Sequence, residues 1–387
     1  MKILYHHRIR SKDGQAVHLE ELIGALRAAG HDVVIAGPAS FARASFGHEP
    51  KLLGAMKKRM PKALYELLEL GYNLPAYRRL YRAWREHRPD ALYERCNLYL
   101  LAGVWLRRRT GVPLLLEVNA PLARERGAFG GLGFPRLARK LEHLVWRSAD
   151  FVLPVTHVLA RELRAAGVPA ERIAVIPNAI DPARFMQQPD TEAAKAALGL
   201  SGKLVIGFTG FMRDWHGLDA VVDWMAGPDA PREMHLLLVG EGPALPHLKA
   251  QAAALGIAGR ISFAGLVDRD TVAKMVAAFD IALQPKAVEY CSPLKLFEYM
   301  ALGKAIAAPD QENIREVLAP EISGLLFDPA RPQSLTAAIS RLAGDESLRA
   351  RLGAEARRTI AARGHTWMEN ARRVAALAEA VKSRCKP

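Results

Sequence analysis

The sequence predicts an α/β protein made of two Rossmann-like domains that face each other across a cleft. Short apolar runs alternate with helically spaced stretches along the whole chain of 387 residues, and this alternation is typical of parallel sheets with right-handed crossovers. A cluster of turn residues at 177–182 leads into a polar stretch that ends near Ser201, after which the alternation starts again. The chain is also too long for one average domain. We therefore predict one domain at 1–185 and a second at 200–387.

The predicted strands are short apolar runs bounded by turn residues or by helical sequence. In the first domain they are 2–5, 32–36, 91–93, 113–118, 151–155 and 173–176. In the second domain they are 204–208, 235–239, 260–263, 281–283, 305–308 and 324–327. Helical patterns include 16–29, after the first strand, and about 368–384, near the end of the chain. Ligands of open parallel sheets bind at the carboxyl ends of the strands, so we expect the functional residues in the loops that follow them.

Basic residues are concentrated in the first half of the chain. The net charge is +14 at pH 7, and residues 1–190 contain 30 Lys and Arg against 18 Asp and Glu. The excess is densest at 51–88, where Leu, Met, Tyr and Trp are interleaved with ten basic and three acidic residues. This mixture indicates peripheral contact with an anionic membrane surface. A pair of ordinary amphipathic helices with a solvated basic face is the alternative interpretation.

The composition argues against several classes of protein. The cysteines Cys96, Cys291 and Cys385 are too scattered for a disulfide framework or a metal-ligand motif, so we expect a reducing cytoplasm, no metal and no cofactor. The apolar run at the N-terminus is short, and we expect no signal peptide. The sequence has no apolar run of about 18 residues, so no transmembrane helix is predicted.

The segment 291–310 predicts an anion site next to a ribose site. Ser292-Pro293-Leu294 forms a turn that leads directly into a helix. The first amides of a helix lack partners and lie at the positive end of its dipole, so they can bind an anion. Lys295 adds a cation, and Glu298 follows one turn later on the same face, where its carboxylate can accept hydrogen bonds from a ribose diol. Together these residues predict a site for a nucleoside diphosphate.

The sequence SPLKLFEYMALGKAIAA at 292–308 resembles the donor-site segment of the retaining nucleotide-sugar glycosyltransferases of family 4, which have the GT-B architecture. Their Glu-x7-Glu pattern has a first Glu that touches the sugar and a second that holds the donor ribose. Glu298 matches the second Glu, whereas the first position is occupied by Tyr290, with Glu289 beside it. The resemblance covers nearly the whole chain. It implies a donor on the second domain, an acceptor on the first, and a last helix, at 368–384, that packs back on the first domain.

A loop near the start of the second domain resembles the phosphate-binding loop of the same family. Gly210 ends the first strand of the domain, and the resemblance implies an Arg directly after it and a Lys before the next glycine. Phe211 and His216 occupy these two positions, and Arg213 lies close enough to supply the displaced cation. Fixed positive groups would offset the charge that develops on the departing diphosphate. A plain surface loop is the alternative interpretation.

Two further turns match the family. Gly240 lies in a strand–GxGP turn, where it is expected to let the backbone approach the donor. Val267 follows another strand, and the resemblance implies that this segment lines the base pocket through backbone atoms.

Four residues are candidates for the acceptor side. Gly14 follows the first strand and suits a tight turn before a helix. Glu117 and Asn119 end a buried strand, and Glu117 has the alternative role of pairing with a nearby Arg. His157 follows Thr156, which is predicted to be a helix N-cap, so His157 is either a cleft residue or an ordinary surface histidine.

The leading hypothesis is a metal-independent retaining glycosyltransferase of polysaccharide biosynthesis, cytoplasmic and at the inner face of the cell membrane. Its donor is a nucleotide diphosphate sugar and its acceptor a lipid-linked or polysaccharide-precursor sugar. Arg213, Lys295 and Glu289 are the predicted catalytic residues. A non-catalytic sugar-nucleotide-binding scaffold protein and a sugar-nucleotide epimerase remain alternatives. A nucleic-acid partner is not expected, because the basic half lacks a recognised reader motif.

Overall fold

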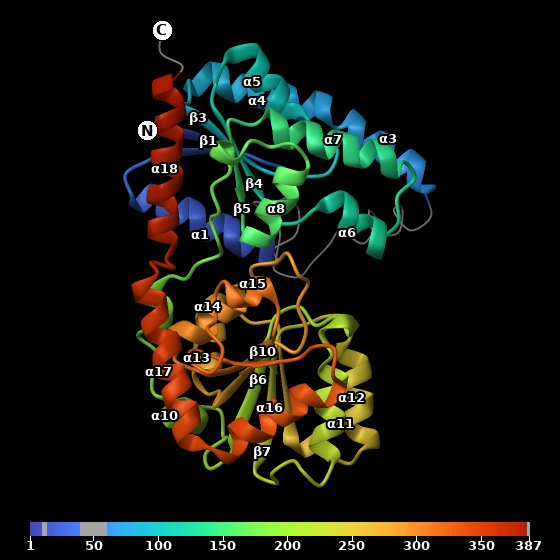
Figure 1. Cartoon of the computed structure of the whole chain (residues 1–387), viewed down its shortest axis with the longest axis vertical. Helices are drawn as coiled ribbons and strands as arrows, with labels where there is room; N and C mark the ends of the chain where they lie inside the picture. Colours follow the sequence, from blue (N-terminus) through green and yellow to red (C-terminus); the bar gives the residue numbers. More distant parts are fainter. Residues whose placement is uncertain (10–13, 39–59, 385–387) are drawn as a thin grey trace. The chain divides into compact units, whose positions relative to one another are not determined.

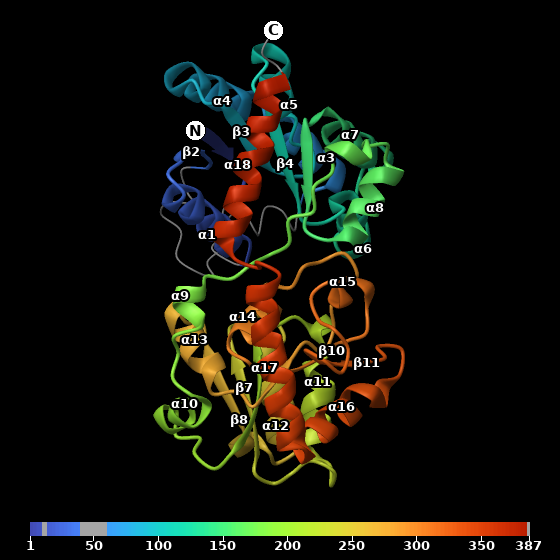
Figure 2. The ribbon, with the colours of Figure 1, turned by 60° about the vertical axis from the view of Figure 1, so that its left-hand side comes forward.

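The computed structural model describes residues 1–9, 14–38 and 60–384 and divides the chain into two compact units (Figures 1 and 2). The first unit consists of Met1–Pro177, Tyr290–Ser292 and Trp367–Pro387, and the second of Asn178–Glu289 and Pro293–Thr366. Each unit contains one parallel sheet with helices around it, which confirms the predicted α/β class with two Rossmann-like domains. The start of the basic segment, 51–59, lies outside the described residues.

The sheet of the first unit has five parallel strands in the order β2-β1-β3-β4-β5. Their bounds are β1 (Lys2–His6), β2 (Asp32–Ala36), β3 (Ala91–Arg95), β4 (Leu114–Val118) and β5 (Phe151–Pro154). Every residue of β3 and β4 is buried, because parallel strands inside such a sheet are covered on both faces. In the strand register His6 lies opposite Glu94, and Arg95 lies opposite Glu117. Four polar side chains therefore meet at the carboxyl edge of this sheet.

The helices of the first unit include one from the end of the chain. They are α1 (Gly14–Ala28), α3 (Lys62–Gly71), α4 (Asn73–His87), α5 (Ala102–Thr110), α6 (Leu122–Phe129), α7 (Pro135–Ser148), α8 (His157–Ala165) and α18 (Trp367–Arg384). Figures 1 and 2 show α18 beside α1. Asn370 and Arg373 of α18 also donate hydrogen bonds of 2.8 and 2.6 Å to the carbonyl oxygens of Pro177 and Val175. These bonds hold the last helix to the first unit.

The sheet of the second unit has six parallel strands in the order β11-β10-β9-β6-β7-β8. Their bounds are β6 (Leu204–Thr209), β7 (Met234–Val239), β8 (Ile261–Gly265), β9 (Ile281–Leu283), β10 (Ala305–Pro309) and β11 (Leu325–Phe327). The helices are α9 (Pro182–Phe185), α10 (Thr191–Ala197), α11 (Leu218–Ala226), α12 (Leu245–Ala254), α13 (Arg269–Ala277), α14 (Leu294–Ala301), α15 (Glu312–Arg315), α16 (Pro332–Gly344) and α17 (Glu346–Ala362). Two apolar clusters form the core of this unit.

One predicted strand, 173–176, is wrong. Ile173 forms only an isolated bridge with Val152, although the amides of Ala174 and Ile176 donate to carbonyl oxygens of β5. The segment then reaches Pro177, whose nitrogen has no hydrogen to donate to a ladder. The other predicted strands are present with ends shifted by at most two residues.

Candidate functional site

The turn before α14 leads directly into the helix. Pro293 occupies the N-cap position with φ −70° and ψ 115°, and it makes no side-chain cap hydrogen bond. Leu294 begins the helix, and Ser292, just before the turn, is buried. Leu294 begins the helix at the positive end of its dipole, where an anion can bind.

Lys295 lies against the end of β6. Its ammonium nitrogen, Nζ, is 3.8 Å from the centroid of the Phe208 ring, a cation–π contact. A methyl group built on Gly210 would lie 3.4 Å from the same nitrogen. Gly210 has φ 128°, a conformation that L side chains rarely adopt. The lysine predicted from the helix start and the glycine predicted from the β6 loop are thus neighbours.

Gly240 allows two backbone segments to touch. Its φ is 130°, and a Cβ there would collide with the carbonyl oxygen of Gly210. Gly242 makes the same close approach to the backbone of Met212, whose amide donates to the carbonyl oxygen of Glu241 at 2.7 Å. The glycines of this turn serve close packing of the two loops that follow β6 and β7.

His216 is held as a neutral imidazole, and Arg213 is exposed. Nδ1 of His216 accepts a hydrogen bond of 3.0 Å from the amide of Arg213. Burial, followed by the charges of Lys295 and Arg213, lowers the pKa of His216 to about 3. Its ring packs against Phe208, at 5.1 Å between centroids. His216 therefore does not carry a positive charge near pH 7, and Arg213 and Lys295 are the two cations beside it.

Glu298 is buried on α14 and pairs with a residue that the sequence did not suggest. Its Oε1 lies 2.5 Å from Nη1 of Arg269, and the Glu298 side chain is 4% exposed. Arg269 begins α13, after the N-cap Asp268, and Val267 lies half-buried in the same loop. The sequence feature that could have identified Arg269 is its position two residues after Val267, in the segment expected to line the base pocket.

Glu289 and Tyr290 have different environments. Glu289 is exposed and belongs to the second unit, whereas Tyr290 is buried and belongs to the first. The carbonyl oxygen of Tyr290 accepts a hydrogen bond of 3.0 Å from Thr156, and the Arg124 guanidinium lies 5.2 Å from its ring centroid. Burial and the nearby Glu125 carboxylate raise the pKa of the Tyr290 phenol. Tyr290 is therefore a neutral, packed side chain.

Glu117 is the centre of a buried polar cluster in the first unit. Its carboxylate accepts hydrogen bonds from Arg95, from Asn119 at 2.5 Å and from Tyr93 at 2.9 Å. Tyr5 and His18 lie at 3.3 and 3.2 Å. With this many partners, Glu117 fits the alternative role of pairing with an arginine, here Arg95. Of the two acceptor-side candidates on this strand, Asn119 is half-buried and Glu117 is buried.

Burial alone would raise the pKa of Glu117. The neighbouring Arg95 and His18 outweigh this effect, so the pKa lies well below its ordinary value. The carboxylate is therefore ionised at neutral pH, and its charge is compensated inside the cluster.

A second buried pair, His6 and Glu94, lies at the same edge of the sheet. Their Nδ1 and Oε2 atoms are 2.5 Å apart, and both side chains are less than 5% exposed. A Cβ on Gly103 would collide with the Glu94 carboxylate, so the glycine makes room for it. The sequence analysis did not single out this pair, although His6 and Glu94 each directly follow a predicted strand.

The remaining acceptor-side candidates flank helix starts. Gly14 begins α1, and His157 is the exposed first residue of α8. Thr156 is the N-cap of α8, as predicted, because its side chain accepts from the amide of Leu159.

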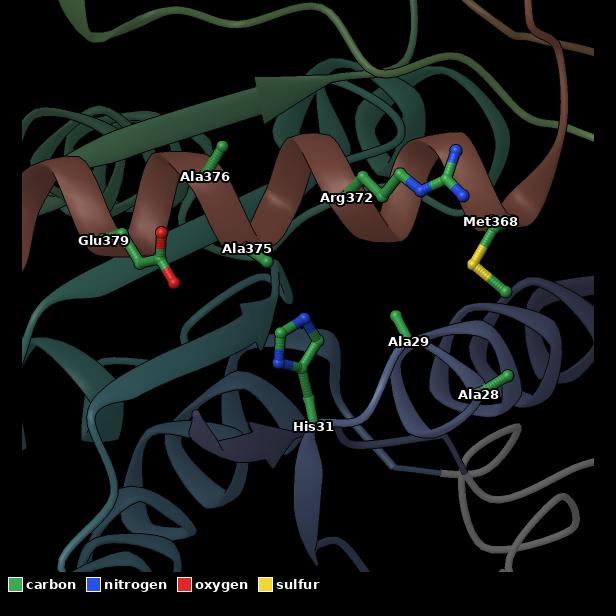
Figure 3. A pocket seen from close by; sticks show the side chains of 8 residues that line it. All are labelled: Ala28, Ala29, His31, Met368, Arg372, Ala375, Ala376 and Glu379. Atoms are coloured by element: carbon green, nitrogen blue, oxygen red, sulfur yellow. The ribbon is translucent and has the colours of Figure 1, made fainter.

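A surface cavity of about 450 Å³ lies between α1 and α18, apart from every predicted site residue (Figure 3). Its lining residues are Ala28, Ala29, His31, Met368, Arg372, Ala375, Ala376 and Glu379.

Within the described parts of the chain, no group of three or more His, Cys, Asp or Glu side chains has a geometry that could hold a metal ion. None of the described helices is long and apolar enough to cross a membrane.

Two family models match the chain, one in each half. Residues 13–179 match a glycosyl transferase 4-like domain, and residues 203–345 match a domain of glycosyl transferases group 1.

Curated relatives carry glycosyltransferase names. The D-inositol 3-phosphate glycosyltransferase of Jonesia denitrificans is 28% identical, over 92% of this chain and 88% of that protein. The 2-deoxystreptamine glucosyltransferase of Streptomyces kanamyceticus is also 28% identical, over 64% of this chain. The chain spans 65% of the length of that protein, and 66% of an alpha-D-kanosaminyltransferase from the same organism.

Solved structures share the fold. HepE of Anabaena in complex with UDP has a TM-score of 0.76 at 18% identity, over 98% of this chain and 100% of that one. A sucrose-phosphate synthase from Thermosynechococcus elongatus has a TM-score of 0.77 at 17% identity, over 99% and 100%. The two halves of the chain thus match a glycosyl transferase 4-like domain and a glycosyl transferases group 1 domain, and the chain has the GT-B fold.

Proposed function

We propose that the chain is a retaining, metal-independent glycosyltransferase that uses a nucleotide diphosphate sugar. The observation that carries this proposal is the grouping in the second unit of Lys295, Arg213 and the N-terminus of α14, with Glu298 one turn further along the helix. Cations and helix amides suit a diphosphate. A buried carboxylate beside them suits the ribose of the same ligand.

Each residue has a distinct role in the proposed reaction. The bond between the anomeric carbon and the phosphate oxygen breaks, and its electron pair stays on the diphosphate. Lys295, Arg213 and the amide of Leu294 at the start of α14 stabilise that charge, which increases in the transition state. The acceptor hydroxyl attacks from the face that the diphosphate leaves and gives its proton to a phosphate oxygen. Glu289 contacts the transferred sugar, and Glu298 holds the ribose.

The donor class is supported by the relatives, whose names point to different nucleotides. The HepE structures contain UDP or UDP-glucose, and a relative from Mycobacterium tuberculosis is a GDP-mannose-dependent alpha-mannosyltransferase. The base is expected to be read by backbone atoms near Val267, so side chains do not reveal it. A test of donor binding therefore needs nucleotides with several bases.

We propose a lipid-linked or polysaccharide-precursor acceptor that reaches the first unit from the inner face of the cell membrane, with the protein in the cytoplasm. Support comes from the outer faces of α3 and α4. The exposed apolar side chains there are Leu64, Leu67, Leu68 and Leu74, and the exposed basic ones are Lys62, Arg78, Arg82 and Arg85. Leucines that insert and cations that meet headgroups are the two parts of an interfacial helix.

Turnover tests the proposed reaction directly. The purified protein is incubated with UDP-, GDP- and ADP-sugars and a fraction of glycolipid acceptors, with and without a chelator. The expected result is a glycosylated acceptor whose anomeric configuration, measured by NMR, matches that of the donor, at a rate the chelator does not change. The Glu298→Ala variant should lose most of this activity.

Other outcomes identify the alternatives. Donor binding without transfer to any acceptor would indicate a scaffold protein. Conversion of the donor without an acceptor would indicate an epimerase. A salt-dependent shift with random DNA and no response to sugar nucleotides would indicate a nucleic-acid binder.

A further inference from the structure

Glu298 makes a buried ion pair that uses only part of its carboxylate. Nη1 of Arg269 bonds to Oε1 of Glu298 at 2.5 Å, and the two side chains are 21% and 4% exposed. Among the described residues, the carboxylate has no other hydrogen-bond partner. An ionised carboxylate offers about four lone-pair sites, so most of its capacity to accept hydrogen bonds remains for a ligand.

Arg269 is fixed from two further sides. Its guanidinium carbon lies 5.3 Å from the centroid of the Phe185 ring, and Phe185 is fully buried. The next residue, Asp270, accepts a hydrogen bond of 3.0 Å from Arg184, which neighbours Phe185 on α9. Helix α9 therefore holds both the side chain and the helix start that carries it.

The ion pair joins two parts of the proposed nucleotide site. Arg269 follows Val267, expected near the base, and Glu298 follows Lys295, expected near the phosphates. We propose that Arg269 is a positioning residue for the donor ribose: it compensates the charge of Glu298 and orients it so that the unbonded oxygen, Oε2, accepts the ribose hydroxyls. This inference rests on the proposed function and deepens it.

The test compares two ligands that differ only in the ribose hydroxyls. Binding of UDP and of 2′,3′-dideoxy-UDP is measured by calorimetry, and GDP and ADP with their dideoxy analogues are used in the same way. The wild-type protein should bind the complete nucleotide about tenfold more tightly, as expected for hydrogen bonds to a charged group. The quantity compared is the ratio of the dissociation constants of the dideoxy and the complete nucleotide. In Arg269→Gln this ratio should fall to below about threefold, as in Glu298→Gln.

Two variants control for non-specific effects. Arg341→Gln removes a guanidinium that pairs with Glu321 on the surface of the same unit, and it should leave the ratio unchanged. In a Glu298→Gln background, Arg269→Gln should have no further effect on the ratio, because Arg269 acts through Glu298. Arg269→Lys keeps the positive charge with another geometry and should give an intermediate ratio. This variant also provides the test if Arg269→Gln does not fold.

Three results overturn the inference or its premise separately. A ratio in Arg269→Gln or Arg269→Lys equal to that of the wild type would reduce Arg269 to a structural role. Tighter nucleotide binding by Arg269→Gln would show that Arg269 competes with the ribose for the Glu298 carboxylate. If the wild-type protein binds no nucleotide, or binds both forms equally, the proposed function or the role of Glu298 fails before Arg269 is considered.

Discussion

At the scale of single residues, the clearest structural role belongs to Glu117. Five donors surround its carboxylate at the carboxyl ends of β1, β3 and β4, and the charge of Arg95 is compensated there. Removing one member of such a buried pair leaves the other charge without compensation, which costs about 3–5 kcal/mol. Glu117 thus shapes the edge of the first sheet by organising its neighbours.

The Glu117→Gln variant should therefore lose about 3 kcal/mol of unfolding free energy at pH 7, measured by chemical denaturation. The folded-state pKa of Glu117 lies below its ordinary value, so its contribution is complete above the unfolded pKa and is lost as pH falls through the folded one. The difference between the wild type and the variant should narrow below about pH 4.

A matched control uses an exposed carboxylate. Glu321 pairs with Arg341 on the surface, and both side chains are about half exposed, so Glu321→Gln should change stability by less than about 1 kcal/mol. If Glu117→Gln were as stable as the wild type at pH 7, the cluster would not depend on this charge.

Some of these residues could be predicted from sequence and others could not. Lys295 and Glu298 follow from a local rule, since a turn and a helix place them one turn apart. His6, Glu94 and Arg269 were missed because their partners are distant in sequence: Glu94 lies 88 residues from His6, and Glu298 lies 29 from Arg269. The neutral state of His216 depends on burial, which the loop sequence alone does not reveal.

At the scale of elements, α3 and α4 both carry exposed side chains that suit a lipid surface. Leu64, Leu67 and Leu68 recur at helical spacing on α3, and each is about half exposed. Arg78, Arg82 and Arg85 are exposed on α4. Buried Glu66 on α3 accepts hydrogen bonds from the amides of Gly133 and Phe134, which fixes the leucines outward.

This surface should bind vesicles of phosphatidylcholine that contain phosphatidylglycerol, measured by co-sedimentation, and not vesicles of phosphatidylcholine alone. Replacing Arg78, Arg82 and Arg85 by Gln should weaken binding about 100-fold, since each cation near anionic lipid contributes about 1 kcal/mol. A Leu64→Ser, Leu67→Ser variant should also bind less. Leu255→Ser, which alters an exposed leucine of the second unit, is the control.

Two results would contradict the membrane proposal. Equal binding to both vesicle types would show that the basic side chains do not contribute to membrane binding. A change from dimer to monomer in the leucine variant would show instead that the leucines contact a second copy of the chain.

Element prediction was most accurate where a local cause exists. Thr156 caps α8 as predicted, because its side chain accepts a hydrogen bond from the amide of Leu159, three residues later. The apolar pattern of 173–176 suits a strand, yet the structure has only an isolated bridge there, and the adjacent Pro177 has no hydrogen to donate to a ladder.

At the scale of the whole molecule, the chain has two units, each with its own parallel sheet. Sequence predicts this division because apolar runs alternate twice with helical stretches, and a polar linker separates the two series. The order of strands in each sheet and the return of α18 to the first unit depend on contacts between residues far apart in sequence. Periodicity alone does not determine such contacts, so the last helix was assigned through the family resemblance.

We propose above all that the second unit binds a nucleoside diphosphate through Lys295 and Glu298. Thermal denaturation with UDP, GDP, ADP and their common sugar conjugates tests it most directly. One nucleotide should raise the midpoint of the wild type, since a ligand at about 100 times its dissociation constant adds about 2.7 kcal/mol. Lys295→Gln and Glu298→Gln should reduce the shift, and Arg341→Gln should retain it. A folded wild-type protein that no nucleotide stabilises would contradict the account.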